Sequence, residues 1–215
     1  MAKIKRIFID LDGPLLCGKE RHYFCYRTIL ERFGFEPIGV EQYWEMKRAR
    51  VIRGDLLRIS GADGIYDQFV SSWLVLIESP EALLLDKPQA GAFNCLLEWK
   101  QRGIEIALVT LRNNHQALLL QLERLGFHSL LDVVLVSKHS LGALGKADVV
   151  QKFCSNQKCD ESDLWIGDTE VDWEAASILG CKIILLANGL RSRGYLKSLR
   201  GAIVKPSIEA LKGHF

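Results

Sequence analysis

The chain has 215 residues, of which 48% are hydrophobic and 25% are charged, with 28 basic and 26 acidic side chains. This composition is typical of a globular protein and excludes a disordered or fibrous chain. The length allows one full domain with a small insertion. The formal net charge of +2 gives no basis for binding nucleic acid or an anionic membrane. The six scattered cysteines lack a zinc-binding spacing and are expected to be reduced.

The first residues are basic and then apolar, as in a signal peptide or a buried strand. Asp10 and Asp12 interrupt the apolar run too early for a signal peptide. No apolar run in the sequence approaches the ~20 residues that a membrane-spanning helix requires. We therefore expect a buried first strand and a cytoplasmic protein with no membrane partner.

Short apolar runs alternate with amphipathic stretches, as in a parallel sheet whose strands are buried on both faces. The predicted strands are Ile4–Ile9, Ile104–Val109, Val133–Val136, Leu164–Ile166 and Ile183–Leu186. The predicted helices that accompany them are Phe93–Arg102, Asn113–Leu125, Lys146–Cys154 and Trp173–Leu179. This order predicts an α/β fold with a Rossmann-like parallel-sheet core.

One segment interrupts this alternation. Between about Leu16 and Asp86 the sequence predicts helices and no strand of the same type. These helices are Tyr23–Phe33, Val40–Arg50, Gly54–Ile59 and Tyr66–Ile77. We expect residues 16–86 to form an inserted helical cap, and residues 1–15 and 87–215 to form the α/β core.

Two carboxylates directly follow the first predicted strand. The sequence Asp10-Leu11-Asp12-Gly13 lets both acidic side chains face one pocket. One carboxylate can stay ionised as a nucleophile, while the other donates a proton to a leaving group. The alternative is an ordinary surface turn, but the position after a wholly apolar strand favours a functional site. An anionic nucleophile that attacks an anionic substrate also requires a cation.

A second acidic motif follows the fourth predicted strand. In Gly167-Asp168-Thr169-Glu170-Val171-Asp172, Asp168 stands at the strand end and Asp172 one helical turn later. Together with Asp10 they form a set of hard oxygen ligands, which suits magnesium rather than zinc. By itself the motif is equally consistent with a helix N-cap.

Three further polar positions lie near predicted strand ends. The hydroxyl of Thr110, with the backbone N–H groups that follow it, can hold a phosphate oxygen. Lys146, which opens a predicted helix, can neutralise a carboxylate and phosphoryl oxygens. Arg112 offers an additional cation for a substrate, with a solvated helix start as the alternative.

The order and strand placement of these motifs resemble the haloacid dehalogenase-like hydrolase superfamily, and specifically its phosphatases with a helical cap. Asp10-Leu11-Asp12-Gly13 resembles the first motif, Thr110 the second, Lys146 the third, and Gly167 through Asp172 the fourth. The resemblance extends over about residues 4–211, and the phosphoglycolate phosphatase-like branch is the nearest. It implies a Rossmann-like core with a C1-type helical cap and Mg²⁺-dependent hydrolysis of a phosphate ester.

The resemblance also implies a role for each catalytic residue. Asp10 would attack phosphorus and form an aspartyl-phosphate. Asp12 would protonate the leaving oxygen and then activate water. Lys146 would stabilise the charge between the nucleophile and the phosphate.

The remaining implied roles concern binding. Thr110, Leu111 and Arg112 would bind the substrate. Asp10, Asp168 and the main-chain carbonyl of Asp12 would ligate Mg²⁺, with Asp172 supporting the metal site or holding Lys146.

Two features separate this chain from parts of the family. Asp12 favours phosphate esters, because dehalogenases lack a carboxylate there and phosphonatases have a small residue. Pro14 stands where the family usually has Thr or Val, which alters the entry into the cap. Two alternatives stay open: a phosphomutase of the β-phosphoglucomutase type, and a non-catalytic phospho-ligand-binding protein.

The predicted cap carries a run of cations around Trp44. Lys47, Arg48, Arg50 and Arg53 form either a solvated basic face or a contact surface for an anionic or planar leaving group, and the solvated face is favoured. The expected partner is a small phosphorylated metabolite, and the expected state is a monomer or homodimer.

Overall fold

The computed structural model describes residues 3–155 and 159–215. Within these residues, one parallel sheet has the strand order β5-β4-β1-β6-β7-β8. The strands are β1 (Arg6–Ile9), β4 (Glu105–Leu111), β5 (Val133–Ser137), β6 (Asp163–Gly167), β7 (Lys182–Leu186) and β8 (Ile203–Lys205). The predicted α/β fold is confirmed, and β8 is a strand that the sequence pattern does not predict.

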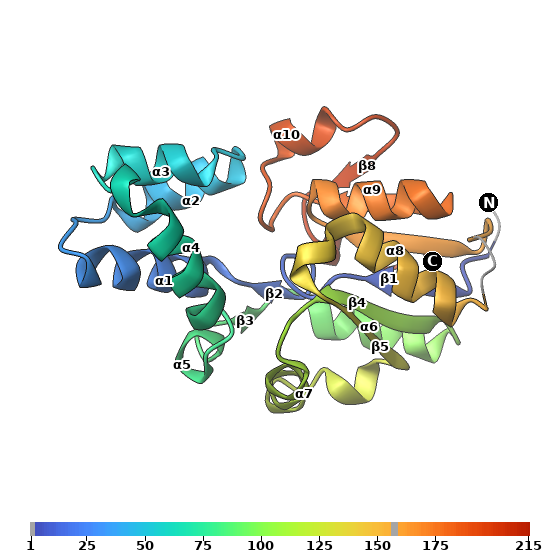
Figure 1. Ribbon diagram of the computed structural model, residues 1–215. Coiled ribbons are helices and arrows are strands. Elements are labelled where there is room, and N and C mark those ends of the chain that lie inside the picture. The colour runs from blue at the N-terminus through green and yellow to red at the C-terminus, as the bar shows by residue number, and fades with distance from the viewer. Residues whose placement is uncertain (1–2, 156–158) are drawn as a thin grey trace.

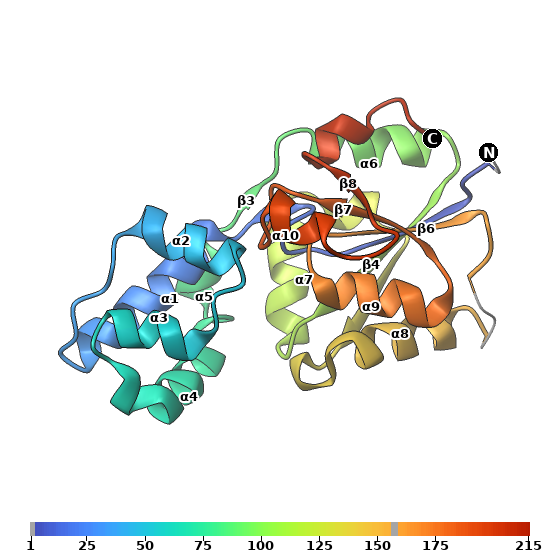
Figure 2. The ribbon, with the colours of Figure 1, turned by 90° about the horizontal axis from the view of Figure 1, so that it is seen from above.

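The sheet is buried on both faces, because alternate residues of each central strand enter two different apolar clusters. In β1, Ile7 and Ile9 pack with α6 (Ala92–Gln101) and α7 (His115–Arg124), whereas Phe8 packs with α8 (Gly142–Phe153) and α9 (Glu170–Leu179). In Figure 2 helix α6 lies above the sheet and helices α8 and α9 lie below it. The continuous apolar runs in the sequence follow from this double burial.

Two core helices begin earlier than the sequence pattern predicts. Helix α8 begins at Gly142 and not at Lys146, so Lys146 lies in its second turn. The glycines at its start suggest a loop, but Gly145 lies against β5, where an added Cβ would be 2.2 Å from the Ser137 hydroxyl oxygen. Close helix–strand packing therefore explains this glycine within the helix. Helix α9 begins at Glu170, behind a capping box formed by Thr169 and Asp172.

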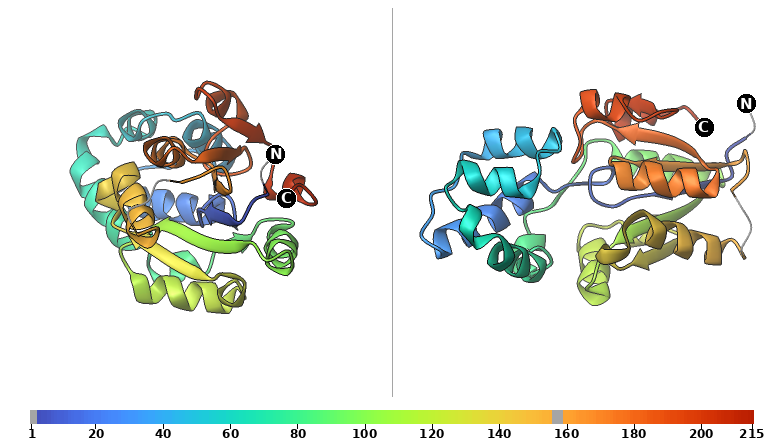
Figure 3. Two further views of the ribbon diagram at one scale, coloured as in Figure 1. Left: turned by 90° about the vertical axis from the view of Figure 1, so that its right-hand side faces the viewer. Right: turned by 45° about the horizontal axis from the view of Figure 1, so that its top comes forward.

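The chain leaves the sheet after β1 and returns before α6 through a short antiparallel pair, β2 (Leu16–Cys17) and β3 (Lys87–Pro88). Between these strands lie α1 (Lys19–Arg32), α2 (Val40–Arg48), α3 (Arg53–Ile59), α4 (Tyr66–Leu76) and α5 (Pro80–Leu83). Figure 1 shows these helices grouped beside the sheet, and the right-hand view of Figure 3 shows the same grouping from another side.

The helical insertion has its own apolar cluster, with Tyr26, Tyr43 and Trp73 among its buried members. Helix α1 starts four residues before its predicted start, so the side chains of Arg21 and His22 belong to a helix. Helix α5 and the short α10 (Arg193–Lys197) lie outside the predicted helices. None of the helices described in residues 3–155 and 159–215 is both long and apolar enough to cross a membrane.

Candidate active site

Asp10 lies directly after the central strand β1, at the carboxyl edge of the sheet. Its backbone N–H donates to Ile166 of β6 at 3.0 Å. One carboxylate oxygen accepts the Leu11 N–H at 2.8 Å, and the other lies 2.8 Å from the Lys146 ammonium. Burial raises the pKa of Asp10 to about 7, with repulsion from Asp172 adding to the shift and Lys146 opposing it.

Lys146 places a fully buried ammonium between two carboxylates. Its Nζ lies 2.8 Å from Asp10 and 2.7 Å from Asp172. Burial alone would lower the pKa of Lys146, but the two carboxylates outweigh this effect and raise it. The ammonium therefore stays charged, and it holds the Asp10 carboxylate in one orientation.

Asp172 is completely buried, and its carboxylate oxygens are used by the protein itself. They accept hydrogen bonds from Lys146 at 2.7 Å, from the Thr169 hydroxyl at 2.8 Å, and from the backbone N–H groups of Asp168 and Thr169 at 3.2 Å. Asp172 thus caps helix α9 and positions Lys146 at once. The helix-capping role that the sequence motif allows and the positioning of Lys146 are therefore both carried out by this one side chain.

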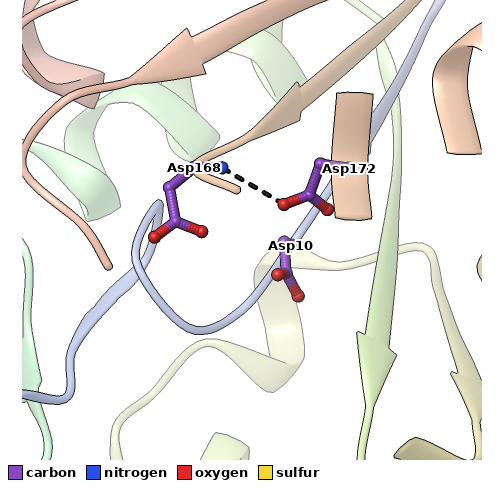
Figure 4. Close-up of side chains that lie close together, drawn as sticks. All are labelled: Asp10, Asp168 and Asp172. Carbon is purple, nitrogen blue, oxygen red and sulfur yellow. Dashed lines mark hydrogen bonds between the residues drawn. The ribbon is translucent and has the colours of Figure 1, made fainter. Parts of the chain in front are cut away.

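Asp168 completes the acidic cluster from the end of β6. Figure 4 shows its carboxylate beside those of Asp10 and Asp172, and one ligand atom of each lies within 4.8 Å of the others. A Cβ at Gly13 or at Gly189 would come within 2.1 Å of the Asp168 carboxylate. The two glycines therefore leave the space that this side chain occupies, and Gly13 also has a φ of 101°.

This cluster fits a hard divalent cation. Burial and repulsion by Asp172 and Asp10 raise the pKa of Asp168 well above its ordinary value. Its Oδ2 accepts the Leu190 N–H, while its buried Oδ1 has no hydrogen-bond partner among the described residues. A bound cation would pair with that oxygen and favour the charged form of Asp10 and Asp168. Carboxylate oxygens are the ligands that Mg²⁺ prefers.

Asp12 points away from this cluster, toward two arginines. Its Oδ1 is ion-paired with Arg21 of α1 and lies 2.9 Å from Arg112, which follows β4. Burial alone would raise the pKa of Asp12, but Arg112 and Arg21 outweigh it and lower the pKa below its ordinary value. Among the predicted metal residues, Asp12 is therefore the one whose side chain lies outside the group formed by Asp10, Asp168 and Asp172.

Arg112 belongs to a buried polar network that sequence reasoning describes only in part. The Nε of Arg21 donates to Asp86 at 2.9 Å, and the other oxygen of Asp86 accepts from Gln121 at 2.7 Å. Arg112 lies 3.9 Å from Asp86, and its Nε is buried with no partner in the described part of the chain. Arg21 and Asp86 are 65 residues apart. Arg21 stands among the polar residues Lys19, Glu20 and His22, so no local pattern indicates that it is buried.

The remaining predicted substrate residues lie beside Asp10. Thr110 is 1% exposed near the carboxyl end of β4, which neighbours β1 in the sheet. Leu111 is the last residue of β4. Because its side chain is apolar, only its backbone groups can make polar contacts. Thr110 and Leu111 therefore lie near the carboxyl end of a strand, as predicted, while their roles in substrate binding stay predictions.

Pro14 lies within a tight loop that leads from Asp12 into β2. The Gly13 N–H donates to the Leu16 carbonyl at 2.8 Å, and the Leu15 N–H donates to the Leu11 carbonyl at 3.1 Å. The loop thus closes through the backbone groups on either side of the proline, whose ring is buried within it. Proline at this position fits the loop as it is built.

Comparison with known proteins identifies a family and several structures of similar fold. Residues 7–186 match the family model of the haloacid dehalogenase-like hydrolases. The fold resembles that of a haloacid dehalogenase-like hydrolase of Streptococcus pneumoniae, with 18% identity, complete coverage of both chains and a TM-score of 0.78. It also resembles a predicted phosphatase of Clostridium acetobutylicum, with 16% identity, 98% and 97% coverage, and a TM-score of 0.75.

A third similar structure is that of a predicted phosphoglycolate phosphatase of Haemophilus somnus, with 17% identity, 98% and 97% coverage, and a TM-score of 0.75. At these identities the solved structures establish a shared fold. The search of curated sequences finds no match. The family model covers most of the chain, including the strands that carry Asp10, Thr110 and Asp168, and the chain therefore belongs to the haloacid dehalogenase-like hydrolases.

Proposed function

We propose that this hydrolase is a magnesium-dependent phosphatase of small phosphorylated metabolites, acting through an aspartyl-phosphate. The observation that carries the proposal is the state of Asp10: a buried carboxylate at the end of the central strand, with one oxygen 2.8 Å from a buried ammonium. Next to it lies the Asp168 Oδ1, which has no hydrogen-bond partner among the described residues. A nucleophile for phosphorus needs this combination of fixed orientation and adjacent positive charge.

In the first step, a carboxylate oxygen of Asp10 attacks phosphorus, and the bond from phosphorus to the ester oxygen breaks. Asp12 delivers a proton to the leaving oxygen from its protonated form, which is the minor form beside Arg21 and Arg112. In the second step, Asp12 takes a proton from water, the resulting hydroxide attacks phosphorus, and phosphate leaves with Asp10 restored. Arg21 and Arg112 favour the charged Asp12, which is the form that accepts the proton from water.

Lys146 neutralises part of the charge that develops between Asp10 and the phosphoryl oxygens. Thr110 and the backbone N–H groups of Leu111 and Arg112, at the neighbouring strand end, would bind the phosphoryl group. Asp10, Asp168 and the Asp12 main-chain carbonyl would hold Mg²⁺, which supplies positive charge for the phosphoryl group.

We propose that the helical insertion acts as a cap. The α2 end contacts the loop that follows β7, where Ser192 donates its N–H to the Arg48 carbonyl at 2.9 Å. We assign residues 16–86 to a cap and residues 1–15 with 87–215 to the catalytic core. Closure of this cap would exclude water while the ester is cleaved.

The test is phosphate release from a panel of phosphorylated metabolites, measured with Mg²⁺ and with EDTA. We expect release that requires Mg²⁺ and that is absent from Asp10→Asn protein purified in parallel, which controls for contaminating phosphatases. Release that is equal in EDTA would contradict the metal dependence. If the protein binds phosphorylated compounds but releases phosphate from none of them, the proposed phosphatase activity is contradicted. That result would favour a phospho-ligand-binding protein.

A further inference from the structure

Arg21 and Asp86 stand where the chain enters and leaves the helical insertion. Arg21 lies in the first turn of α1, shortly after β2, and Asp86 directly precedes β3. Each is 2% exposed, and the Arg21 Nε donates to the Asp86 carboxylate at 2.9 Å. The two segments that join the insertion to the core are therefore connected by a buried ion pair as well as by the pairing of β2 with β3.

The planar guanidinium of Arg21 is held in one orientation by several partners. Its Nε is engaged by Asp86, and its Nη1 donates to the Ile77 carbonyl at 3.4 Å. Gly18 leaves room for the guanidinium, since a Cβ at that position would lie 3.3 Å from Nη2. Because a buried guanidinium is costly without partners, these contacts fix where it lies. The remaining nitrogen, Nη2, is ion-paired with Asp12 in the loop after β1.

Asp12 is therefore held by cations from two different elements. Arg21 reaches its Oδ1 from α1, and Arg112 reaches the same oxygen at 2.9 Å from the segment after β4. A carboxylate with one contact can turn about it, whereas two contacts from different directions fix its orientation. The other oxygen, Oδ2, accepts no hydrogen bond from the described residues, and the side chain is 20% exposed. Oδ2 is thus the oxygen that stays available to a substrate.

Asp12 also lies beside the loops that enclose the acidic cluster. It lines a small hollow together with Gly13, Gly189 and Leu190. The same three residues surround the Asp168 carboxylate. A Cβ on either glycine would lie 2.1 Å from that carboxylate, and Leu190 donates its N–H to it. The hollow that Asp12 borders therefore adjoins the acidic cluster.

We propose that Arg21, fixed by Asp86, is a positioning residue for Asp12. It holds the Asp12 carboxylate so that Oδ2 stays free for the leaving oxygen of the substrate and for water. The inference rests on the proposed phosphatase function, and it adds a residue of the helical insertion to that reaction. Arg21 itself would touch neither the substrate nor the metal.

The test compares esters whose leaving oxygens differ in their need for a proton. A general acid accelerates the loss of a basic alkoxide far more than that of 4-nitrophenoxide, which leaves without protonation. The values to compare are kcat/KM for 4-nitrophenyl phosphate and for the alkyl phosphate that the metabolite panel ranks highest. In Arg21→Met we expect the ratio of alkyl to aryl kcat/KM to fall about tenfold or more, part of the roughly 10²–10⁴-fold acceleration that a general acid supplies.

This ratio separates positioning from a merely structural effect, because partial unfolding lowers both kcat/KM values equally. Arg27→Met is the matched control, since Arg27 is 48% exposed on the same helix and pairs with Glu31, and it should leave the ratio unchanged. Thermal unfolding shows which variants are folded. Should Arg21→Met not fold, Arg21→Met combined with Asp86→Asn leaves no unpaired carboxylate at position 86 and should lower the ratio in the same way.

A double variant shows whether Arg21 acts through Asp12. In Asp12→Asn the ratio should already be low, and adding Arg21→Met should not lower it further. A further fall would overturn the proposal, because Arg21 would then act on the substrate directly. So would an unchanged ratio in Arg21→Met, or a ratio that rises because the loss of Arg21 only makes the protonated Asp12 more common.

Failure of the proposed function gives a different result, which is no hydrolysis of any ester by the unmodified protein. Crystal structures of the unmodified protein and of Arg21→Met then test the positioning directly. We expect the Asp12 carboxylate in its present orientation in the first structure and turned from it in the second. An Asp12 carboxylate that keeps its orientation without Arg21 would overturn the proposal.

Discussion

The acidic cluster and a cationic cavity at the helical insertion are opposite in charge and in how they are built. In the core, the carboxylates of Asp10, Asp168 and Asp172 form one cluster, and the Lys146 ammonium pairs with Asp10 and Asp172. Around the cavity lined by Lys47, Arg53 and Arg191, which we call the cap cavity, the Glu170 carboxylate pairs with two cations, Arg50 and Arg191. One region lacks positive charge and the other lacks negative charge.

The two regions also differ in what holds their charged groups. Core carboxylates stand on strand ends and helix caps, and the backbone passes close to them at Gly13 and Gly189. Cations of the cap cavity lie at the ends of long side chains that lean on aromatic rings. Changes in the core should therefore affect catalysis and folding together, whereas changes in the cap cavity should mainly affect stability and its dependence on pH.

The largest expected effect tests the core side of this comparison. Asp10→Asn keeps the shape of the side chain but removes the nucleophilic charge, so we expect turnover to fall by at least ~10³-fold. Phosphate release measures the loss, and circular dichroism checks that the fold is retained. Activity close to that of the unmodified protein would remove Asp10 as the nucleophile.

The second prediction concerns the balance of charge around Lys146. Lys146→Met leaves the neighbouring carboxylates without their ammonium, and we expect the free energy of unfolding to fall by about 3–5 kcal/mol. Mg²⁺ should restore part of this loss. Lys152→Met is the matched control, because Lys152 is 70% exposed on the same helix and pairs with Asp148. Denaturant unfolding measures the free energy of unfolding of both variants. Equal losses would show that the buried Lys146 ammonium contributes no more stability than the exposed Lys152.

A third, smaller effect tests how closely the backbone encloses Asp168. The added Cβ in Gly189→Ala would lie 2.1 Å from the Asp168 carboxylate, whereas Gly194→Ala has open space around its Cβ. We expect the first variant to lose about 1–3 kcal/mol of stability. It should also lose the rise in thermal unfolding midpoint that Mg²⁺ produces, while Gly194→Ala keeps it. A rise that persists in Gly189→Ala would place the metal away from Asp168.

The smallest expected effect lies in the cap cavity and depends on pH. The folded-state pKa of Lys47 is about 7, below its ordinary value of 10.5. Between these pH values the unfolded chain binds more protons than the folded one, so stability should rise with pH. The rise should be larger in the unmodified protein than in Lys47→Met, as measured by unfolding at pH 7 and pH 10.

The groups that face Lys47 do not themselves account for such a rise. The nearby side chains include arginines, a residue type that does not titrate in this range. Burial raises the pKa of the Cys25 thiol to about 12. A pH dependence that is identical in Lys47→Met would show that the Lys47 ammonium is not destabilised by burial.

Much of the candidate site is readable from the sequence, because its residues stand where apolar strands end. Asp10, Thr110 and Asp168 each follow or close a run of buried residues, and parallel strands bring their carboxyl ends to one edge. The position of Lys146 within α8 is less readable. Its helix begins four residues earlier than predicted, since two glycines that suggest a loop are part of the helix.

The sequence by itself determined the fold class, the helical insertion and the acidic motifs, because these depend on periodicity and on residues adjacent in the chain. Only the tertiary structure decided that Asp12 lies between Arg21 and Arg112, and that Arg191 of the core joins Lys47 and Arg53 around one cavity. Long charged side chains reach partners far away in sequence. Whether such a side chain is solvated or buried depends on how separate elements pack, which no local pattern encodes.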